Sequence, residues 1–199
     1  MPSPPPRPPP VFDPDLELPA GELHLRPIRE ADAEEVFPFF SDPAFPRFMT
    51  WDAHRTLDET REFLRNIETR RNVQQSMTWA VMRKGVIVGC IGLLDISFKV
   101  RALQVNRCEL GYWTAPHAQG QGVAFRASQV AMRWAFETLG LHRITVGCVA
   151  DNEASRKVIE RLGFRFVARL EEDCYREERW WDVLRYALRA TEWRELQGA

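Results

Sequence analysis

The sequence has no run of eighteen apolar residues, which is about the length that a helix needs to cross a bilayer. Its N-terminus also lacks the apolar core of a secretory signal, so we expect the protein to stay in the cytoplasm. The sequence also lacks an excess of either sign of charge, because 27 basic and 28 acidic residues leave a net charge of -1. Without a basic excess, nothing in the composition indicates direct nucleic-acid binding or a membrane partner.

Cysteine and histidine are few and scattered. The four cysteines form no CxxC pair and the four histidines show no HxH or HxxxH spacing, so the usual ligand patterns of a zinc site are missing. Cys90 and Cys148 lie inside apolar runs typical of strands, where a free thiol behaves as a small hydrophobic side chain. The sequence therefore predicts no metal cofactor.

Proline is concentrated at one end of the chain. Nine of the 14 prolines fall within the first nineteen residues, and this segment has too little apolar content to form a core. We expect a disordered, proline-rich tail over residues 1–20 and a single folded domain over residues 21–199, a length that suits one core. The tail is interpreted as a solvated leader, with docking into an aromatic groove of a partner as the alternative.

The rest of the sequence alternates between the patterns of strands and helices. Hydrophobic periodicity and capping residues predict the order β, α, α, β, β, β, α, β, α, β, β, a mixed α/β fold with a largely antiparallel first half. Lys84-Gly85 marks a hairpin, and Thr56 with Glu59 has the capping pattern that begins the second helix. The segment from Cys108 to Val149 predicts a right-handed crossover between two parallel strands.

The stretch HAQGQGVAFRA, residues 117–127, lies between a predicted strand and a long predicted helix. Gly120 and Gly122 lack Cβ atoms, and the first-turn N–H groups of the helix have no partners within it, so backbone donors face the loop. Such a loop binds an anion, and a diphosphate fits. A Walker loop is excluded because no lysine follows Gly122 in register, and a dinucleotide-binding loop because Phe125 replaces its third small residue. A tight structural turn is the alternative.

Gln119 to Ala124 match Gln/Arg-x-x-Gly-x-Gly/Ala, the acetyl-coenzyme A loop of the GNAT acetyltransferase superfamily. Flanking segments resemble that family in the same order: ELGYWTAP, LGLHRITVGCVADNEASRKVIERLGF and the closing DVLRYALRATEW. From about Leu23 to Trp193 the sequence is similar to the ribosomal-protein N-terminal acetyltransferases of the Rim type. The resemblance implies a GNAT fold, with about seven mostly antiparallel strands splayed at two parallel ones and about four flanking helices. It also implies an acetyl-CoA-dependent N-acetyltransferase.

The resemblance further implies which residues bind acetyl-CoA, the co-substrate, between the two separating strands. Lys157 or Arg126 is expected to contact the nucleotide phosphates, with a solvated side chain as the alternative for Arg126. Asn152 also suits the N-cap of its helix, and the two roles are compatible. The other matching positions are Tyr112, Trp113 and Thr114 for the pantetheine arm, Gln119, Gly120, Gln121, Gly122, Val123 and Ala124 for the diphosphate, and Asn152 and Ser155 near the thioester.

The expected chemistry is direct attack of a neutral amine on the thioester, because the coenzyme already carries the activated acyl group. A backbone N–H near Trp113 or Thr114 is the expected donor to the developing oxyanion. Ser155 is the candidate for protonating the departing thiolate, since Ile159 occupies the position where many members of the family carry a tyrosine.

A general base must take the proton that the amine loses. Glu109, just ahead of the splayed strand segment, is the first candidate, and Asp95 on the preceding strand is the second. Either carboxylate can act through a water molecule. The alternative for Glu109 is structural, with the carboxylate holding neighbouring strands together by hydrogen bonds.

The acceptor is expected to be the α-amine of a protein N-terminus. An α-amine with a pKa of about 8 is roughly one-tenth neutral at pH 7, whereas lysine, with a pKa of about 10.4, is neutral in under about one molecule in a thousand. Asp52 and Glu59 are placed to attract an ammonium. The side chains expected to form the acceptor wall, with burial in the core as the alternative, are Phe45, Phe48, Met49 and Trp51.

Two other functions stay open at this point. One is an N-acetyltransferase for a small amine, such as a polyamine, an amino acid or an aminoglycoside, although a polyamine enzyme needs a denser acidic groove than the sequence indicates. The other is a non-catalytic acyl-CoA sensor or interaction module, against which Glu109 and Ser155 argue. A homodimer is suggested by the resemblance alone.

Overall fold

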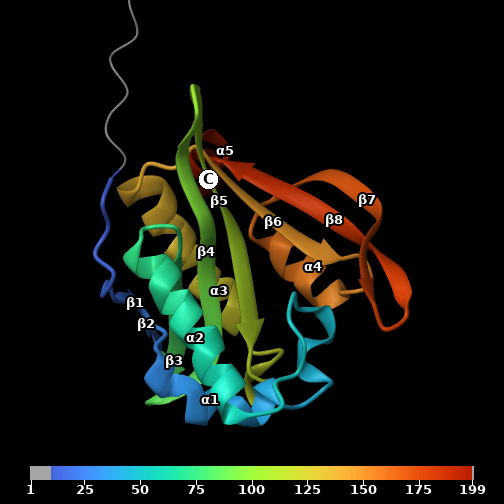
Figure 1. Ribbon diagram of the computed structural model, residues 1–199. Coiled ribbons are helices and arrows are strands. Elements are labelled where there is room, and N and C mark those ends of the chain that lie inside the picture. The colour runs from blue at the N-terminus through green and yellow to red at the C-terminus, as the bar shows by residue number, and fades with distance from the viewer. Residues whose placement is uncertain (1–9, 199) are drawn as a thin grey trace, which may run out of the picture.

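Eight strands form one sheet in the order β1-β2-β3-β4-β5-β6-β8-β7 (Figure 1). The computed structural model describes residues 10–198. Neighbouring strands are antiparallel except for β5 and β6, which are parallel, so the predicted class and the predicted parallel pair are confirmed. The strands are β1 (Leu18–Ala20), β2 (Leu23–Pro27), β3 (Met77–Arg83), β4 (Val86–Val100), β5 (Leu103–Thr114), β6 (Arg143–Val149), β7 (Arg165–Arg176) and β8 (Arg179–Arg189).

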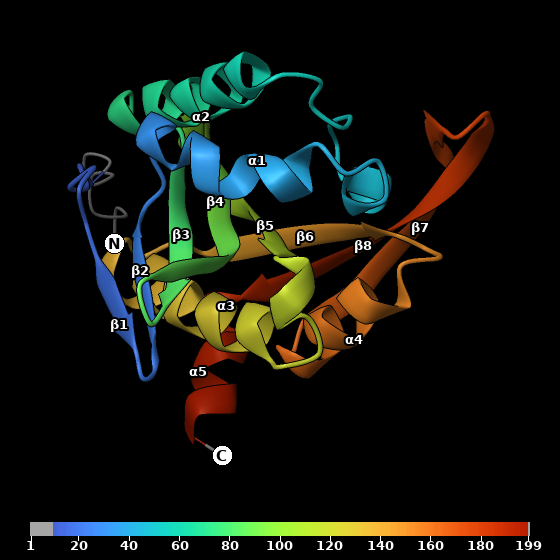
Figure 2. The ribbon, with the colours of Figure 1, turned by 90° about the horizontal axis from the view of Figure 1, so that it is seen from below.

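Helices cover both faces of the sheet. Seen from below, α1 and α2 lie on one face, and α3 and α4 lie on the other (Figure 2). A fifth helix, α5, follows the last strand, and a π-helical turn over Trp134–Thr138 continues α3. The α-helices are α1 (Ala33–Phe40), α2 (Leu57–Asn72), α3 (Val123–Arg133), α4 (Glu153–Arg161) and α5 (Ala190–Gly198).

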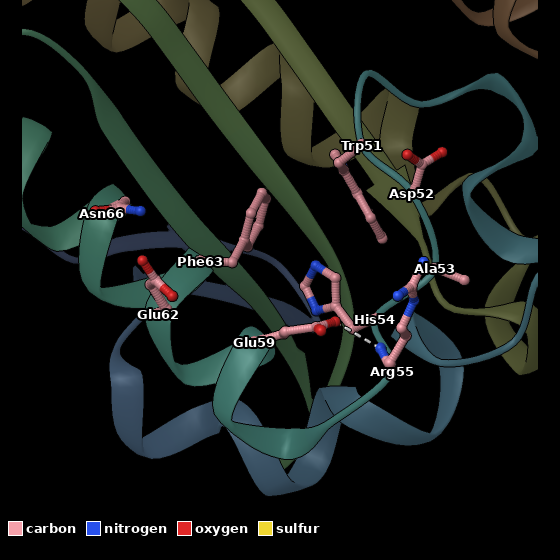
Figure 3. Close-up of a pocket in the computed structure, with 9 residues that line it drawn as sticks. All are labelled: Trp51, Asp52, Ala53, His54, Arg55, Glu59, Glu62, Phe63 and Asn66. Carbon is pink, nitrogen blue, oxygen red and sulfur yellow. Dashed lines mark hydrogen bonds between the residues drawn. The ribbon is translucent and has the colours of Figure 1, made fainter.

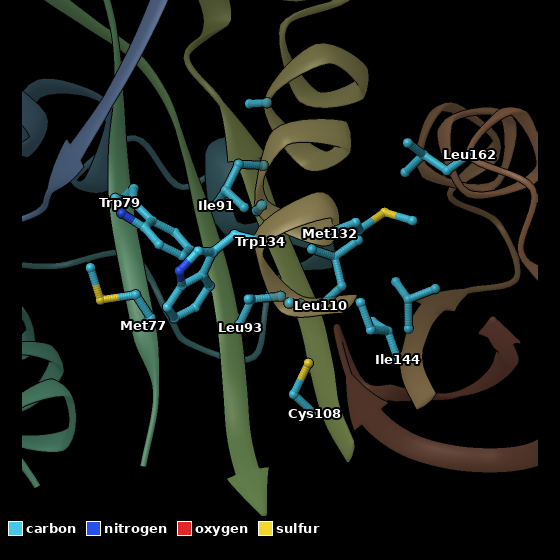
Figure 4. Close-up of a cluster of buried hydrophobic side chains, with 14 of the residues drawn as sticks. Met77, Trp79, Ile91, Leu93, Cys108, Leu110, Met132, Trp134, Ile144 and Leu162 are labelled. Carbon is cyan, nitrogen blue, oxygen red and sulfur yellow. The ribbon is translucent and has the colours of Figure 1, made fainter. Parts of the chain in front are cut away.

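The main core lies between the sheet and α3. Alternate residues of β3 and β4, among them Trp79 and Leu93, point toward Met132 and Trp134 (Figure 4). Trp79 and Trp134 meet edge to face, with their ring centroids 5.4 Å apart. A second cluster around Phe40 fills the other face, beneath α1 and α2. Because both faces are covered, the first residues of β3 are buried without alternation.

The chain is packed from Phe12 onward, earlier than predicted. The Phe12 side chain is buried in the main core, and its backbone exchanges two hydrogen bonds with the Gln74 amide (2.8 and 3.0 Å). The Trp79 indole donates to the Leu16 carbonyl (2.9 Å), and β1 pairs with β2. The prediction of a disordered tail is therefore wrong for its second half, because a few isolated apolar side chains of this segment pack into the core. The first half of the predicted tail, residues 1–9, lies outside the described residues.

β5 and β6 diverge shortly after they meet. Their parallel pairing ends with Glu109 opposite Thr145. Beyond Glu109, β5 stays paired with β4 as far as Thr114, and β6 stays paired with β8. The accompanying bulge lies in β4, where Asp95 has a φ of 50°, and bulges increase the local twist. This divergence of the two parallel strands is called the splay below, and it is the feature that the resemblance predicted.

The last strand ends at Arg189, and α5 replaces the end of the predicted closing segment. Glu192, in the first turn of α5, accepts hydrogen bonds from the backbone N–H (2.9 Å) and guanidinium (2.8 Å) of Arg189. It also accepts from Arg165 (2.9 Å). The hydrogen bond from the Arg189 side chain and these further contacts lower the pKa of Glu192 to about 2.

The lowered pKa of Glu192 predicts that the protein loses stability in acid. Because the pKa of Glu192 is lower in the folded chain than its ordinary value of 4.5, its contribution to the free energy of unfolding is complete above about pH 5 and falls as the pH drops toward about 2. We expect Glu192→Gln to lower the free energy of unfolding at pH 7 by about 1 kcal/mol and to remove this pH dependence. Urea unfolding at pH values from 2 to 7 measures the free energy of unfolding of each protein. Glu195→Gln, at an exposed position of the same helix, is the control. Equal acid sensitivity in all three proteins would contradict the assignment.

Candidate active site

The loop before α3 presents a row of unpaired backbone donors. Within residues 10–198, none of the N–H groups from Gly120 to Phe125 has a hydrogen-bond partner. Gly122 is the N-cap of α3, and both Gly120 and Gly122 have a φ of 72°, in the left-handed region that glycine tolerates. No side chain caps this helix, so its first turn keeps the free donors that suit an anion.

Side chains hold this loop by its carbonyl groups. Gln121 accepts a hydrogen bond from Arg83 (2.8 Å) and donates to the His117 carbonyl (2.9 Å). Arg126 donates to the Gln121 carbonyl (3.2 Å) and forms an ion pair with Glu22 (2.5 Å). The ion pair offsets the unfavourable position of a cation at a helix N-terminus. Arg126 thus holds the loop in place through a loop carbonyl group, and the backbone N–H groups of the loop stay free.

The backbone of β5 offers polar groups to the splay at alternate residues. The Ala115 N–H donates to the Val88 carbonyl on β4 (3.0 Å), and since successive residues direct their backbone groups to opposite edges of a strand, those of Trp113 also face β4. The groups of Tyr112 and Thr114 face the edge from which β6 has diverged. This geometry does not support the predicted pantetheine and oxyanion contacts of Trp113, whose indole is buried beneath α1 and α2. For Tyr112 and Thr114 they stay predictions.

Tyr112 and Ser155 meet where α4 approaches β5. Their hydroxyls share a hydrogen bond, with 2.8 Å between Oη and Oγ, and the Tyr112 hydroxyl lies 3.2 Å from the Ser155 carbonyl. Burial raises the pKa of Tyr112 to about 12, so its hydroxyl stays protonated at neutral pH. Asn152 caps α4 by accepting from the Ser155 N–H (3.1 Å). Lys157 is exposed and pairs with Glu153 (3.4 Å).

Glu109 lies on the same face of β5 as Trp113, at the end of the parallel pairing. One oxygen of its carboxylate pairs with Arg185 of β8 (2.9 Å), and both side chains are partly exposed. The structure therefore contains the strand-linking contact that was the structural alternative for Glu109, and the second carboxylate oxygen is free for another contact within the described residues. Asp95, the second candidate base, pairs with Arg70 of α2 (2.5 Å).

The predicted acceptor wall belongs to the loop between α1 and α2, which extends toward the hairpin of β7 and β8 (Figure 2). Phe45 and Trp51 pack against the second core cluster, as the alternative for these residues expected. Phe48 instead contacts β8. Arg176 in β7 donates to the carbonyls of Met49 (2.6 Å) and Trp51 (3.1 Å), so the wall is tied to the far side of the splay.

A recess of about 410 Å³ lies beside this loop (Figure 3). The rings of Trp51, His54 and Phe63 line it and pack against one another, with centroid distances of 5.3, 5.4 and 5.5 Å. Burial lowers the pKa of His54, which favours its neutral form. Asp52 and Glu59 also line the recess, as the sequence interpretation of an ammonium site requires. The lining residues are Trp51, Asp52, Ala53, His54, Arg55, Glu59, Glu62, Phe63 and Asn66.

Two basic residues of the site were missed in the sequence. Arg185 pairs with Glu109, and the signal for it is Gly147, its partner in the β6–β8 register. A Cβ on Gly147 would lie 2.9 Å from the Arg185 Nη1 atom, so the missing side chain makes room for the guanidinium. Arg176 has no such signal, because its loop partners are more than a hundred residues away in the sequence.

The cysteines are free, and Cys90, Cys108 and Cys148 are buried. Burial raises the pKa of each of these three thiols, so they stay protonated. In the part of the chain that the structure describes, no group of three or more His, Cys, Asp or Glu side chains is arranged to hold a metal ion. No helix in that part combines the length and apolar content needed to span a membrane.

A sheet splayed at its parallel pair, with free donors at the following helix, defines an acetyltransferase of the GNAT class. The family model described as "Acetyltransferase (GNAT) domain" matches residues 22–165, and the chain belongs to this family. The ribosomal protein uS5-alanine N-acetyltransferase of Escherichia coli (strain K12) is 30% identical over 103 residues, which cover 52% of this chain and 53% of that protein.

Two of the solved structures that share the fold illustrate the comparison. One is RimL, a ribosomal L7/L12 alpha-N-protein acetyltransferase in complex with coenzyme A, with a TM-score of 0.79 and 20% identity, covering 87% of this chain and 98% of that one. The other is the spermidine N-acetyltransferase from Vibrio cholerae in complex with CoA and spermine, with a TM-score of 0.76 and 20% identity, covering 86% and 98%. The chain is thus a GNAT-family N-acetyltransferase, and the non-catalytic alternative is set aside.

The loop geometry predicts that Gly122→Ala weakens coenzyme binding. A Cβ at this position has open space, but the φ of 72° strains an alanine by about 1 kcal/mol, so the loop shifts and its donors lose alignment. We expect a roughly fivefold higher Kd for coenzyme A by calorimetry, the equivalent of about 1 kcal/mol. Gly21→Ala is the matched control, because Gly21 has a φ of 70° and open space in the β1–β2 turn. Equal affinities in the two variants would contradict the role of the loop.

Proposed function

We propose that the protein transfers the acetyl group of acetyl-CoA to the α-amine of a protein N-terminus, of the kind carried by ribosomal proteins, in the cytoplasm. The observation that carries this proposal is that the polar groups around the splay lie on two opposite faces of the sheet. The free donors of the loop before α3 and the hydroxyl pair of Tyr112 and Ser155 lie on one face. Glu109 and the loop between α1 and α2 lie on the other. A thioester held at the splay is then open to an amine from the opposite face.

The coenzyme-binding roles follow from backbone geometry. The N–H groups from Gly120 to Ala124 hold the diphosphate, with help from the helix dipole. The free edge of β5 at Tyr112 and Thr114 binds the pantetheine arm, and the Thr114 N–H is the donor to the developing oxyanion. Ser155, ordered by the Asn152 cap, contacts the sulfur. No metal ion takes part.

Glu109 accepts the proton of the amine through a water molecule. Its ion pair with Arg185 fixes one carboxylate oxygen, and the other has no hydrogen-bond partner among the described residues. A carboxylate is a weak base toward an ammonium, so this site suits an amine that is already partly neutral. An α-amine meets this condition at pH 7 far better than a lysine side chain does. The ribosomal acetyltransferase activity of the similar proteins supports the same acceptor class.

The recess beside Trp51 favours a second candidate, a polyamine acceptor. Aromatic faces and three carboxylates suit an organic cation, and one enzyme of similar fold is a spermidine N-acetyltransferase. Two of the carboxylates are already engaged, however. Asp52 pairs with Arg176 (3.1 Å), and Glu59 accepts from the backbone N–H of Arg55 (2.6 Å). This reduces the charge left for a polyamine, so the α-amine is preferred.

A panel of amines tests the acceptor. We expect acetylation of peptides with free N-termini that begin with a small residue, and at least tenfold lower kcat/KM for spermidine, free amino acids and aminoglycosides, because the loop binds peptide chain beyond the amine. Mass spectrometry reads the acetylated products. The matched control is each peptide with a blocked N-terminus and an internal lysine. Turnover confined to small amines, or to the blocked peptides, would overturn the acceptor.

The role of Glu109 predicts the effect of its isostere. We expect Glu109→Gln to lower kcat roughly 10- to 100-fold at pH 7, with little change in KM for acetyl-CoA, because it removes a proton acceptor and keeps the shape. Steady-state kinetics with the best acceptor of the panel measure this. Asp95→Asn tests the second candidate in parallel. Full activity of Glu109→Gln together with a large loss in Asp95→Asn would reverse the assignment.

A further inference from the structure

The hydroxyl pair of Tyr112 and Ser155 joins the two elements that border the splay. Tyr112 lies three residues beyond Glu109 on β5, past the last parallel pair, and Ser155 lies in the first turn of α4. Their oxygens are 2.8 Å apart, although the residues are 43 positions apart in the sequence. Asn152 fixes the Ser155 backbone at the same time (3.1 Å). The pair is therefore held from both sides.

A serine hydroxyl without a partner rotates about its Cβ–Oγ bond, and its hydrogen points in any staggered direction. Ser155 has one hydrogen and two lone pairs on Oγ, and the phenol of Tyr112 supplies one hydrogen. That hydrogen has two acceptors within reach, the Ser155 Oγ atom at 2.8 Å and the Ser155 carbonyl at 3.2 Å, and the shorter contact is to Oγ. When Tyr112 donates to Oγ, the Ser155 hydrogen is directed away from Tyr112. Cys148 of β6 lies within hydrogen-bonding reach of the Ser155 side chain, so Ser155 stands between β5 and β6, the two diverging strands.

We propose that Tyr112 is a positioning residue, whose phenol donates to the Ser155 Oγ atom and so keeps the Ser155 hydrogen aimed at the sulfur of the thioester. The proposal rests on the proposed function. As the C–S bond breaks, its electron pair stays on the sulfur, which accepts the hydrogen bond from Ser155. The amine's proton passes through water to Glu109 and from there to solvent, and the departing thiolate takes one proton from solvent in exchange, so Tyr112 and Ser155 keep their own protons through the cycle.

Tyr112 is unsuited to supply that proton itself. Burial raises the pKa of its phenol to about 12, and a phenolate at this position would be poorly solvated. Cys148 is protonated for the same reason, since burial raises the pKa of its thiol as well. Both groups are therefore neutral at pH 7, so neither places a charge beside the Ser155 hydroxyl.

A double-mutant cycle separates this role from simple packing. Tyr112→Phe removes one oxygen and keeps the partly buried ring. We expect it to lower kcat about 5- to 10-fold with KM for acetyl-CoA changed less than about twofold, the size of one hydrogen bond that acts in the transition state. In the Ser155→Ala background the same substitution should lower kcat less than about twofold further, because the hydroxyl that it orients is gone.

Tyr186→Phe is the matched control. The Tyr186 side chain is buried and its hydroxyl also faces α4, where it donates to Glu160 (3.4 Å), but it lies outside the hydroxyl pair. We expect its kcat to equal that of the wild type. Equal losses from Tyr112→Phe in the wild-type and Ser155→Ala backgrounds would show that Tyr112 acts through packing. Full activity of Tyr112→Phe or of Ser155→Ala would overturn the proposal directly.

The outcome is distinguishable from failure of the proposed acceptor. The cycle is measured with whichever amine of the panel reacts fastest, so turnover of small amines alone overturns the α-amine and leaves the cycle in force. A protein that acetylates no amine of the panel, yet binds coenzyme A, overturns both proposals together.

Discussion

The site depends on one broken contact, the end of hydrogen bonding between β5 and β6 after Glu109 and Thr145. Each strand keeps its outer neighbour, so the sheet stays whole while two inner edges separate. Backbone groups that a continuous sheet would satisfy are left for a ligand. The bulge in β4 at Asp95 lies beside this point and contributes twist where the strands part.

Because side chains alternate along β5, the two faces of the sheet carry different functional groups at the splay. Tyr112 points toward α4, while Glu109 and Trp113 point toward α1 and α2. Long-range contacts complete both faces. Arg185 from β8 reaches Glu109, and Arg176 from β7 holds the loop between α1 and α2. In the proposed mechanism, β5 contacts both substrates because its odd and even positions face opposite ways.

The element order, the parallel pair and the glycine loop were predictable because each is written in local spacing. Gly122 before an apolar helical stripe and Asn152 before Ser155 are patterns of a few residues. The packing of Phe12 was missed, since a proline-rich composition hides a few apolar anchors whose partners lie far along the chain. The ion pair of Glu109 with Arg185 escaped for the same reason: charge pairing between strands depends on register, which local spacing does not determine.

The absence of an N-cap side chain on α3 has an energetic consequence. Most helices satisfy their first N–H groups with a serine, threonine or aspartate from the chain itself, a contribution of about 1 kcal/mol. Here a glycine stands at that position, and no side chain caps the first turn. In the proposed site a bound anion takes the part of the missing capping residue, so ligand binding and folding are linked: the more tightly the folded chain binds the anion, the more the anion raises its free energy of unfolding.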